Sequence, residues 1–299
     1  MSWLLRAFFE LLRPAYRSCR ICGKMITEAR LEGMAGFNPY ARYVKNMLCL
    51  DCCGSVPWIE TGQIRCHACG RSVPCEDCIR APGSELVRNR SAVRYDEGMK
   101  ALLARLKYRG DEAISLLLEA MLYPAFEHMT SDIHRLYFSH LDRRKHRFQS
   151  WSDSLQGSVN QASVVWDAIT YVPISIQRAQ ERGFNQAQLL ADGLAKRYSL
   201  PAIALLDRVR DTPKQSIQSR KARFHNTEAL FSPVPEAVRL LQLLSANGSV
   251  QQGRHSANTI RILIMDDIYT TGSTLRACAK SLCETGVPVE VYSLTWARG

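Results

Sequence analysis

No stretch of the 299-residue sequence approaches the ~18 uninterrupted apolar residues that a membrane-spanning helix needs. The apolar stretch near the N-terminus is interrupted by Arg6, Glu10 and Arg13, which excludes a span or a signal-peptide core there. We expect this stretch to be an amphipathic helix that ends before Pro14. The sequence therefore predicts a cytoplasmic protein, and contact with the inner face of the membrane would come through partners.

Acidic residues are also scarce, with 28 Asp and Glu against 39 Lys and Arg, which leaves a formal net charge of +11. This balance favours an anionic partner, such as a phosphorylated small molecule, a nucleic acid or a membrane surface. The sequence has no G-x-x-x-x-G-K segment, which excludes a Walker-type phosphate loop. The length accommodates either one large α/β core plus a smaller module or two ordinary domains.

Cysteine is nearly absent after residue 79 and concentrated before it. Eight of the cysteines form C-x-x-C pairs, namely Cys19/Cys22, Cys49/Cys52, Cys66/Cys69 and Cys75/Cys78. In a reducing compartment such pairs are typical of metal ligands rather than disulfides. Two pairs supply the four thiolates of a tetrahedral zinc site, so we predict one or two structural zinc ions.

The cysteine pattern leaves several alternatives open. The pairs can combine in sequential order or in an interleaved ribbon, and a redox or iron–sulfur role is the alternative to zinc. The segment 82–84, Pro-Gly-Ser, marks the end of this module, so we place it at 1–83. The module is either a small cap that needs metal to fold or a surface that grips a partner, nucleic acid included.

The segment 261–275 combines an apolar strand, two acids and a hydroxyl-rich turn. Four of the five residues at 261–265 are apolar, which predicts a strand buried on both faces. Asp266 and Asp267 follow, and a helical pattern begins near Leu275. The turn between them contains Thr270, Thr271, Gly272, Ser273 and Thr274.

Such a turn, leading into a helix N-terminus, offers backbone N–H groups and hydroxyls to a phosphate. The acids suit sugar hydroxyls or a bound Mg²⁺, so the segment describes a site for a ribose 5-phosphate. The plain alternative is a buried strand followed by an ordinary polar turn.

The rest of the chain alternates strands and helices. We expect strands at 166–174, 203–206, 261–265 and 289–296, with helices outside and between them. This order predicts a parallel sheet with right-handed crossovers and a ligand at the carboxyl ends of its strands.

Helices precede the first of these strands. Asp96 or Glu97 starts a helix that Gly110 ends, and Asp111 starts the next. Further on, Arg178 and Arg182 lie four residues apart, and Asn185 is a plausible N-cap.

Three polar segments interrupt the pattern. We expect 210–223 to be a mobile loop that closes over pyrophosphate, and 140–163 and 245–259 to be insertions without regular structure. The basic run at 140–147 is either merely solvated or suited to a phosphate backbone.

Beyond these patterns, the sequence resembles the ComF family, which is tied to the uptake and handling of single-stranded DNA during natural transformation. The resemblance rests on the four C-x-x-C pairs and on the motifs at 107–110, 172–173, 182–186, 211–212, 215 and 266–274, in that order. The last of these also resembles the phosphoribosyl pyrophosphate (PRPP) motif of type I phosphoribosyltransferases.

The resemblance implies an α/β architecture of the type I phosphoribosyltransferase fold at 84–299, a parallel twisted sheet flanked by helices, with an N-terminal cysteine-rich zinc module. It implies Asp266 and Asp267 as catalytic residues, with Mg²⁺ accompanying PRPP. Besides the loop at 270–274, we expect PRPP to be bound by Lys107, Arg178 and Arg182. Purine salvage enzymes of the hypoxanthine type carry a carboxylate where this chain has Thr270, which counts against that substrate class.

Three functions remain open at this point. The first is a competence protein that binds PRPP or a related ribose phosphate, with single-stranded DNA and DNA-uptake proteins as partners. The second is an active phosphoribosyltransferase acting on a nucleobase or another nitrogen nucleophile. The third is a degenerate enzyme that serves as a scaffold, which the retention of both acids and of the full loop disfavours.

Overall fold

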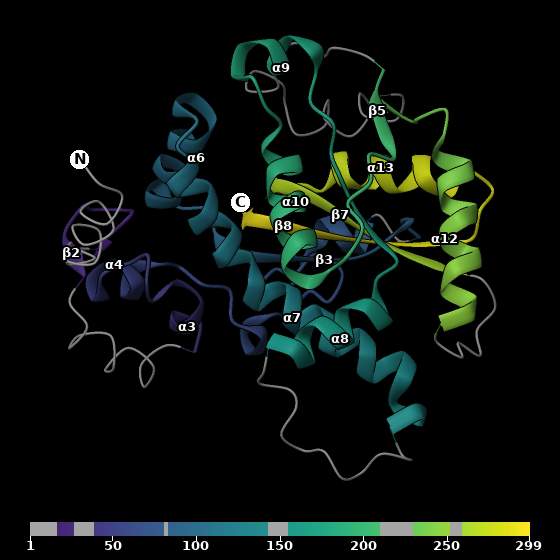
Figure 1. Ribbon diagram of the computed structural model, residues 1–299, viewed down its shortest axis with the longest axis horizontal. Helices are drawn as coiled ribbons and strands as arrows, with labels where there is room; N and C mark the ends of the chain where they lie inside the picture. The colour runs from purple at the N-terminus through teal and green to yellow at the C-terminus, as the bar shows by residue number, and fades with distance from the viewer. Residues whose placement is uncertain (1–16, 27–38, 81–82, 143–154, 210–229, 252–258) are drawn as a thin grey trace, which may run out of the picture. The chain divides into compact units, whose positions relative to one another are not determined.

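The structure is a computed structural model that describes residues 17–26, 39–80, 83–142, 155–209, 230–251 and 259–299 (Figure 1). The chain forms two compact units, Met1–Pro57 and Trp58–Gly299. The helix expected at 1–14, the segment 210–223 and most of the basic run at 140–147 lie outside the described residues. No helix of the described part is both long and apolar enough to cross a membrane.

The described part of the smaller unit contains a short hairpin and two short helices. Strand β1 (Arg17–Ser18) pairs antiparallel with β2 (Met25–Ile26). Helices α3 (Ala41–Val44) and α4 (Leu50–Ser55) follow. The described part of this unit buries few large apolar side chains, Leu48 among them, and domains with so small a core commonly depend on a bound metal.

The larger unit is organised around a four-stranded sheet in the order β3-β8-β7-β4, in which every neighbouring pair is parallel. The strands are β3 (Leu86–Arg94), β4 (Ala168–Tyr171), β7 (Ile260–Tyr269) and β8 (Val289–Arg298). The expected parallel sheet is thus confirmed. Strand β7 runs further than expected, through both acids to Tyr269.

Helices cover both faces of this sheet. The α-helices described in the larger unit are α5 (Glu76–Arg80), α6 (Glu97–Arg109), α7 (Glu112–Asp142), α8 (Leu155–Val165), α9 (Ile176–Arg182), α10 (Gln186–Tyr198), α12 (Ala237–Gln251) and α13 (Ser273–Cys283). Helices α7 and α10 pack on one face and on each other, and α12 and α13 cover the other (Figure 1). Because helices bury both faces, β7 is apolar at consecutive positions, as 262–265 show.

The helix termini follow the local sequence. Asp96 caps α6 by accepting a hydrogen bond from the Met99 amide at 2.8 Å, and Gly110 ends that helix in the left-handed conformation. Asn185 caps α10 by accepting from the Ala187 amide at 3.0 Å. These three predicted caps are confirmed.

The sequence missed the first strand of the sheet. Strand β3 lies before α6, where we expected helices alone, and it pairs with β8. Its buried positions include Asn89, Arg90 and Ser91, so its sequence lacks the apolar run of an inner parallel strand. The polar side chains are satisfied by distant partners: Ser91 and Thr295 share a hydrogen bond of 2.6 Å.

Three other expectations need correction. The segment 203–206 is not a full strand of the main sheet. It begins next to a single parallel bridge between Ala202 and Ile169 of β4, where the Ile203 amide donates to the Ile169 carbonyl at 2.9 Å. Strand β5 (Leu206–Arg208) then pairs antiparallel with β6 (Phe231–Pro233). Helix α8 occupies part of the insertion expected at 140–163, and α12 extends into the one expected at 245–259. The domain boundary expected near residue 83 stays a prediction.

Candidate ligand pocket and cysteine groups

A cavity of ≈ 580 Å³ lies at the carboxyl ends of β4 and β7, the edge where parallel sheets bind ligands. Its volume is within the range of small-molecule sites, roughly 300–1,000 Å³. Seven of the residues predicted to bind or transform a ligand line it: Lys107, Arg178, Arg182, Asp266, Asp267, Thr270 and Thr274. Separate elements thus bring these side chains to one place.

The predicted turn leads from β7 into α13. Gly272 takes the left-handed conformation, with φ of 77°, and is the N-cap of α13. The Thr271 hydroxyl accepts a hydrogen bond from the Ser273 amide at 3.4 Å and donates to the Ser273 hydroxyl at 3.2 Å. Thr271, Gly272 and Ser273 are not among the residues that line the cavity, so they shape the turn beside it.

The two acids differ in their contacts. Asp267 forms an ion pair with Lys107, which α6 brings to the cavity. A side-chain oxygen of Asp266 accepts a hydrogen bond from the Asp267 amide at 2.8 Å. Burial, and after it the charge of Asp267, raises the pKa of Asp266 to about 8, against the opposing effects of the hydrogen bond from the Asp267 amide and of the Lys107 charge.

Two of the cations that line the cavity, Arg178 and Arg182, belong to α9. Ser175 caps this helix by accepting from the Arg178 amide at 3.3 Å. The Arg182 guanidinium donates to the Gln186 side chain at 2.9 Å and lies 5.9 Å from the centre of the Tyr108 ring. Four cationic side chains, Lys107, Arg178, Arg182 and Arg208, therefore line one cavity together with two carboxylates. This arrangement suits a ligand that carries both phosphate and hydroxyl groups.

Sequence reasoning did not connect several residues of the cavity wall with the site. Four of them are Tyr95, Arg208, Leu230 and Phe231. Tyr95 directly follows β3, so recognition of that strand would have placed it at the same edge as the acids. The other three belong to or adjoin the small β5–β6 sheet, whose strands are too short to leave a pattern.

The eight paired cysteines gather into two groups of four. One contains Cys19, Cys22, Cys49 and Cys52, and the other contains Cys66, Cys69, Cys75 and Cys78; within each, the sulfur atoms lie within 4.8 Å of one another. The combination is therefore the sequential one. Cys53 stays outside the first group and is buried in the smaller unit.

The donor sets fit zinc. Tetrahedral coordination with Zn–S bonds of about 2.3 Å separates the sulfurs by roughly 3.8 Å. The sulfurs of Cys22 and Cys49 are 3.7 Å apart. Burial, followed by the neighbouring cysteines, raises the pKa of Cys52 and of Cys78, so the thiolates of each group need a cation to share the site. Either group could hold a zinc ion.

The fold and these sites define a class: an α/β protein with a parallel sheet flanked by helices, two four-cysteine groups able to hold zinc, and a polar cavity at the carboxyl edge of the sheet. The chain is 29% identical to the competence protein ComFC of Bacillus subtilis over 84% of both chains. It is 24% identical to the competence protein F of Haemophilus influenzae over 84% of this chain and 98% of that protein. These similarities support the assignment of the chain to the ComF family.

A shorter match gives higher identity. The chain is 32% identical to the DNA utilization protein YhgH of Escherichia coli O6:H1, over 43% of this chain and 48% of that protein. No family model matches the chain.

Proposed function

We propose that this protein binds PRPP or a related ribose phosphate, together with Mg²⁺, and acts in DNA uptake and the handling of single-stranded DNA during natural transformation. The observation that carries the ligand proposal is that Asp266, Asp267, the two ends of the turn at Thr270 and Thr274, and four cations line one cavity. The DNA proposal is supported by the names of the relatives, competence protein and DNA utilization protein. The net charge of +11 supports it as well.

Each part of the cavity suits one part of the ligand. The turn and the N-terminus of α13 would take the 5-phosphate, and Asp266 and Asp267 would accept hydrogen bonds from the ribose hydroxyls or hold Mg²⁺. Lys107, Arg178 and Arg182 would balance the charge of the pyrophosphate. Bound Mg²⁺ would supply a positive charge that stabilises the leaving pyrophosphate.

The parallel sheet and the place of this cavity also support a type I phosphoribosyltransferase fold for the larger unit. We further propose one structural zinc ion in each cysteine group, because a closed set of four thiolates leaves no open coordination position for catalysis.

A second candidate function is phosphoribosyl transfer to a nitrogen nucleophile. It is favoured by Tyr95 and Phe231, which add aromatic side chains to the wall of the same cavity and would suit a flat acceptor. The residues named above would position the ribose and stabilise charge, which is most of what this transfer requires.

One experiment separates these functions. PRPP binding with Mg²⁺ is measured by calorimetry, and pyrophosphate release is measured with a panel of nucleobases, with and without single-stranded DNA. In Asp267→Asn we expect PRPP affinity to fall about tenfold or more, because the carboxylate that pairs with Lys107 and would contact the ligand is lost. The melting temperature should stay that of the wild type. Release with one acceptor would identify an enzyme, and binding without release a sensor or anchor.

The matched control is Asp132→Asn. Asp132 also pairs with a cation, Arg135 at 2.6 Å on α7, and does not line the cavity. We expect it to bind PRPP as the wild type does. Equal affinity of Asp267→Asn and wild type, or no PRPP binding by the wild type, would contradict the proposed ligand site.

A further inference from the structure

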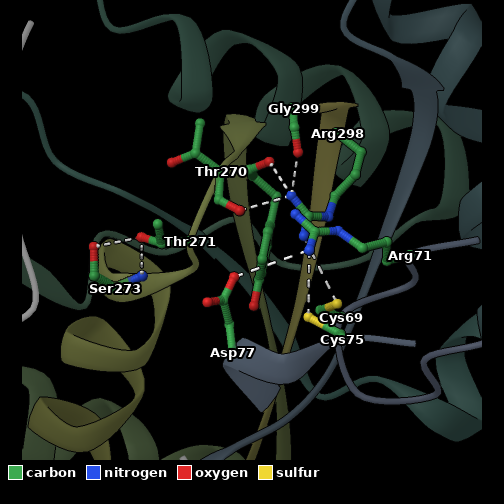
Figure 2. A network of polar contacts seen from close by, with 10 residues as sticks. Cys69, Arg71, Cys75, Asp77, Thr270, Thr271, Ser273, Arg298 and Gly299 are labelled. Atoms are coloured by element: carbon green, nitrogen blue, oxygen red, sulfur yellow. Dashed lines mark hydrogen bonds and ion pairs between the residues drawn. The ribbon is translucent and has the colours of Figure 1, made fainter. Parts of the chain in front are cut away.

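Arg298, the last residue of β8, connects the second cysteine group to the turn beside the cavity. Its side chain is deeply buried, with the residue 7% exposed. One terminal nitrogen donates to the sulfur of Cys69 at 3.8 Å. The other donates to the carbonyl oxygens of Tyr269 at 2.9 Å and Thr270 at 2.6 Å, and Figure 2 shows this guanidinium between the turn and the cysteines.

The same guanidinium supports the turn through the Tyr269 ring. It lies 4.6 Å from the centre of that ring, and Tyr269 is 3% exposed. The hydroxyl end of the ring lies where a side chain on Gly272 would have to be. A continuous line of contacts therefore runs from Cys69 through Arg298 and Tyr269 to Gly272.

The contact of Arg298 with the Thr270 carbonyl also sets the direction of the Thr271 amide. The oxygen of Thr270 and the amide hydrogen of Thr271 lie on opposite sides of one planar trans peptide. Holding the oxygen at Arg298 therefore fixes the direction of the next N–H group in the turn, the kind of donor that a phosphate would use.

The other end of this line is anchored to the sheet. The Asn89 side chain on β3 donates to the Cys69 carbonyl at 3.2 Å, and its backbone amide donates to the Ala68 carbonyl at 2.7 Å. Arg90 donates to the His67 carbonyl at 3.0 Å. The 66–69 knuckle is therefore part of the sheet's framework, and a metal that closes the four-cysteine group would fix the position of the Cys69 sulfur.

We propose that the Cys66, Cys69, Cys75 and Cys78 group, with its metal bound, holds the 269–274 turn in its binding conformation through Arg298, which acts as a positioning residue. The ligand of the turn rests on the function proposed above, whereas the mechanical link between the metal group and the turn does not. The Cys19, Cys22, Cys49 and Cys52 group has no part in this link.

The test uses the full chain with Arg298→Gln, and Arg71→Gln as the matched control. Arg71 also donates to a sulfur of the same group, Cys75 at 3.8 Å, and pairs with Asp77 at 4.0 Å, but its hydrogen bonds and ion pairs among the described residues do not reach the turn (Figure 2). Amide hydrogen exchange of 269–275, zinc content and PRPP affinity are measured for each variant.

In Arg298→Gln we expect exchange at 269–275 to be about tenfold faster or more, with bound zinc unchanged. PRPP affinity should fall by roughly 10- to 100-fold, the usual range for removal of a residue that orients a site through its neighbours. Arg71→Gln should match the wild type in exchange at the turn. Equal exchange in the two arginine variants would overturn the proposal, and failure of the wild type to bind PRPP would overturn only the proposed ligand.

A second pair of variants tests the role of the metal. Cys66→Ser removes a ligand of the second group that Arg298 does not contact, and Cys22→Ser removes a ligand of the first group. Each should lower zinc content by one ion per chain, and only Cys66→Ser should speed exchange at 269–275. Acceleration in both variants, or in neither, would overturn the link between this metal group and the turn. If Cys66→Ser does not fold, the comparison of the arginine variants still decides the role of Arg298.

Discussion

Adjacent carboxylates in one cavity cannot both keep a charge without help. Asp267 has Lys107 as its ion-pair partner, whereas burial raises the pKa of Asp266 to about 8. In the free protein at pH 7, Asp266 therefore holds its proton for most of the time. Because the pKa in the folded state is above the unfolded value, this group favours folding most below about pH 4, and its contribution falls as the pH rises toward about 8.

This state of Asp266 predicts proton release on ligand binding. A bound Mg²⁺ or a ribose hydroxyl favours the ionised acid, so binding at pH 7 should release up to about one proton from this group and should strengthen as the pH rises toward about 8. Calorimetry in buffers with different ionisation enthalpies measures the release. The Asp266→Asn variant has no carboxyl proton to lose at this position, so any protons that this variant releases on binding come from the ligand. Equal release by the wild type and this variant would contradict the prediction.

At the scale of elements, the junction of β7 and α13 depends on a glycine for two reasons. Gly272 has a positive φ, and the Tyr269 hydroxyl fills the space where its side chain would lie. Gly286, after the other end of α13, has the same φ of 77° but open space around it. The two glycines therefore separate the cost of backbone conformation from the cost of contact.

We expect Gly286→Ala to destabilise the protein by about 1 kcal/mol and to leave PRPP affinity unchanged, because only the left-handed conformation is penalised. Gly272→Ala has the same conformational cost, and its methyl group must also displace the buried Tyr269 ring from the Arg298 guanidinium. We therefore expect it to destabilise the fold more than Gly286→Ala does and to weaken PRPP binding about tenfold or more. Chemical denaturation and calorimetry provide the two measurements. Equal binding by the two variants would show that the Tyr269 contact does not support the turn.

The elements that could be predicted from the sequence are those whose defining residues lie close together along the chain. Strand β7 is an apolar run because both faces are covered, and the following turn carries its acids and hydroxyls within a few residues. The caps at Asp96 and Asn185 act on amides two or three residues away. Strand β3 could not be recognised in this way, because Asn89 and Ser91 are buried through partners on β8 that are 204 residues away.

The residues of the candidate site also differ in whether a local motif reveals them. The turn, both acids and the cysteine pairs could be found as local motifs, and their gathering around one cavity and in two groups of four follows from the fold. Arg298 could not be found, because nothing in its own segment distinguishes it from a surface cation. Its role emerges only from the strand order, which puts the end of β8 between β3 and β7.

At the scale of the whole molecule, the net charge of +11 makes the DNA proposal testable without knowledge of the binding surface. Cationic side chains that meet DNA phosphates release counterions, so the affinity for single-stranded DNA should fall about tenfold or more between roughly 50 and 200 mM salt. Fluorescence anisotropy of a labelled oligonucleotide measures this. A zwitterionic solute at the same osmolarity is the control and should have little effect. An affinity that does not fall with salt would contradict an electrostatic mode of binding.

The strand order also has a consequence for the growing chain. Strand β3 is made early, but its partner β8 comes about two hundred residues later, as the separation of 204 between Ser91 and Thr295 shows. During synthesis, the edge of β3 that pairs with β8 therefore stays unpaired while the segments between the two strands are made. Unpaired strand edges in incompletely folded chains are prone to aggregate, which is one reason why nascent chains need chaperones. The turn at 269–274 also lacks its contact with Arg298 until β8 has emerged, so the turn reaches its final contacts only after that strand has been made.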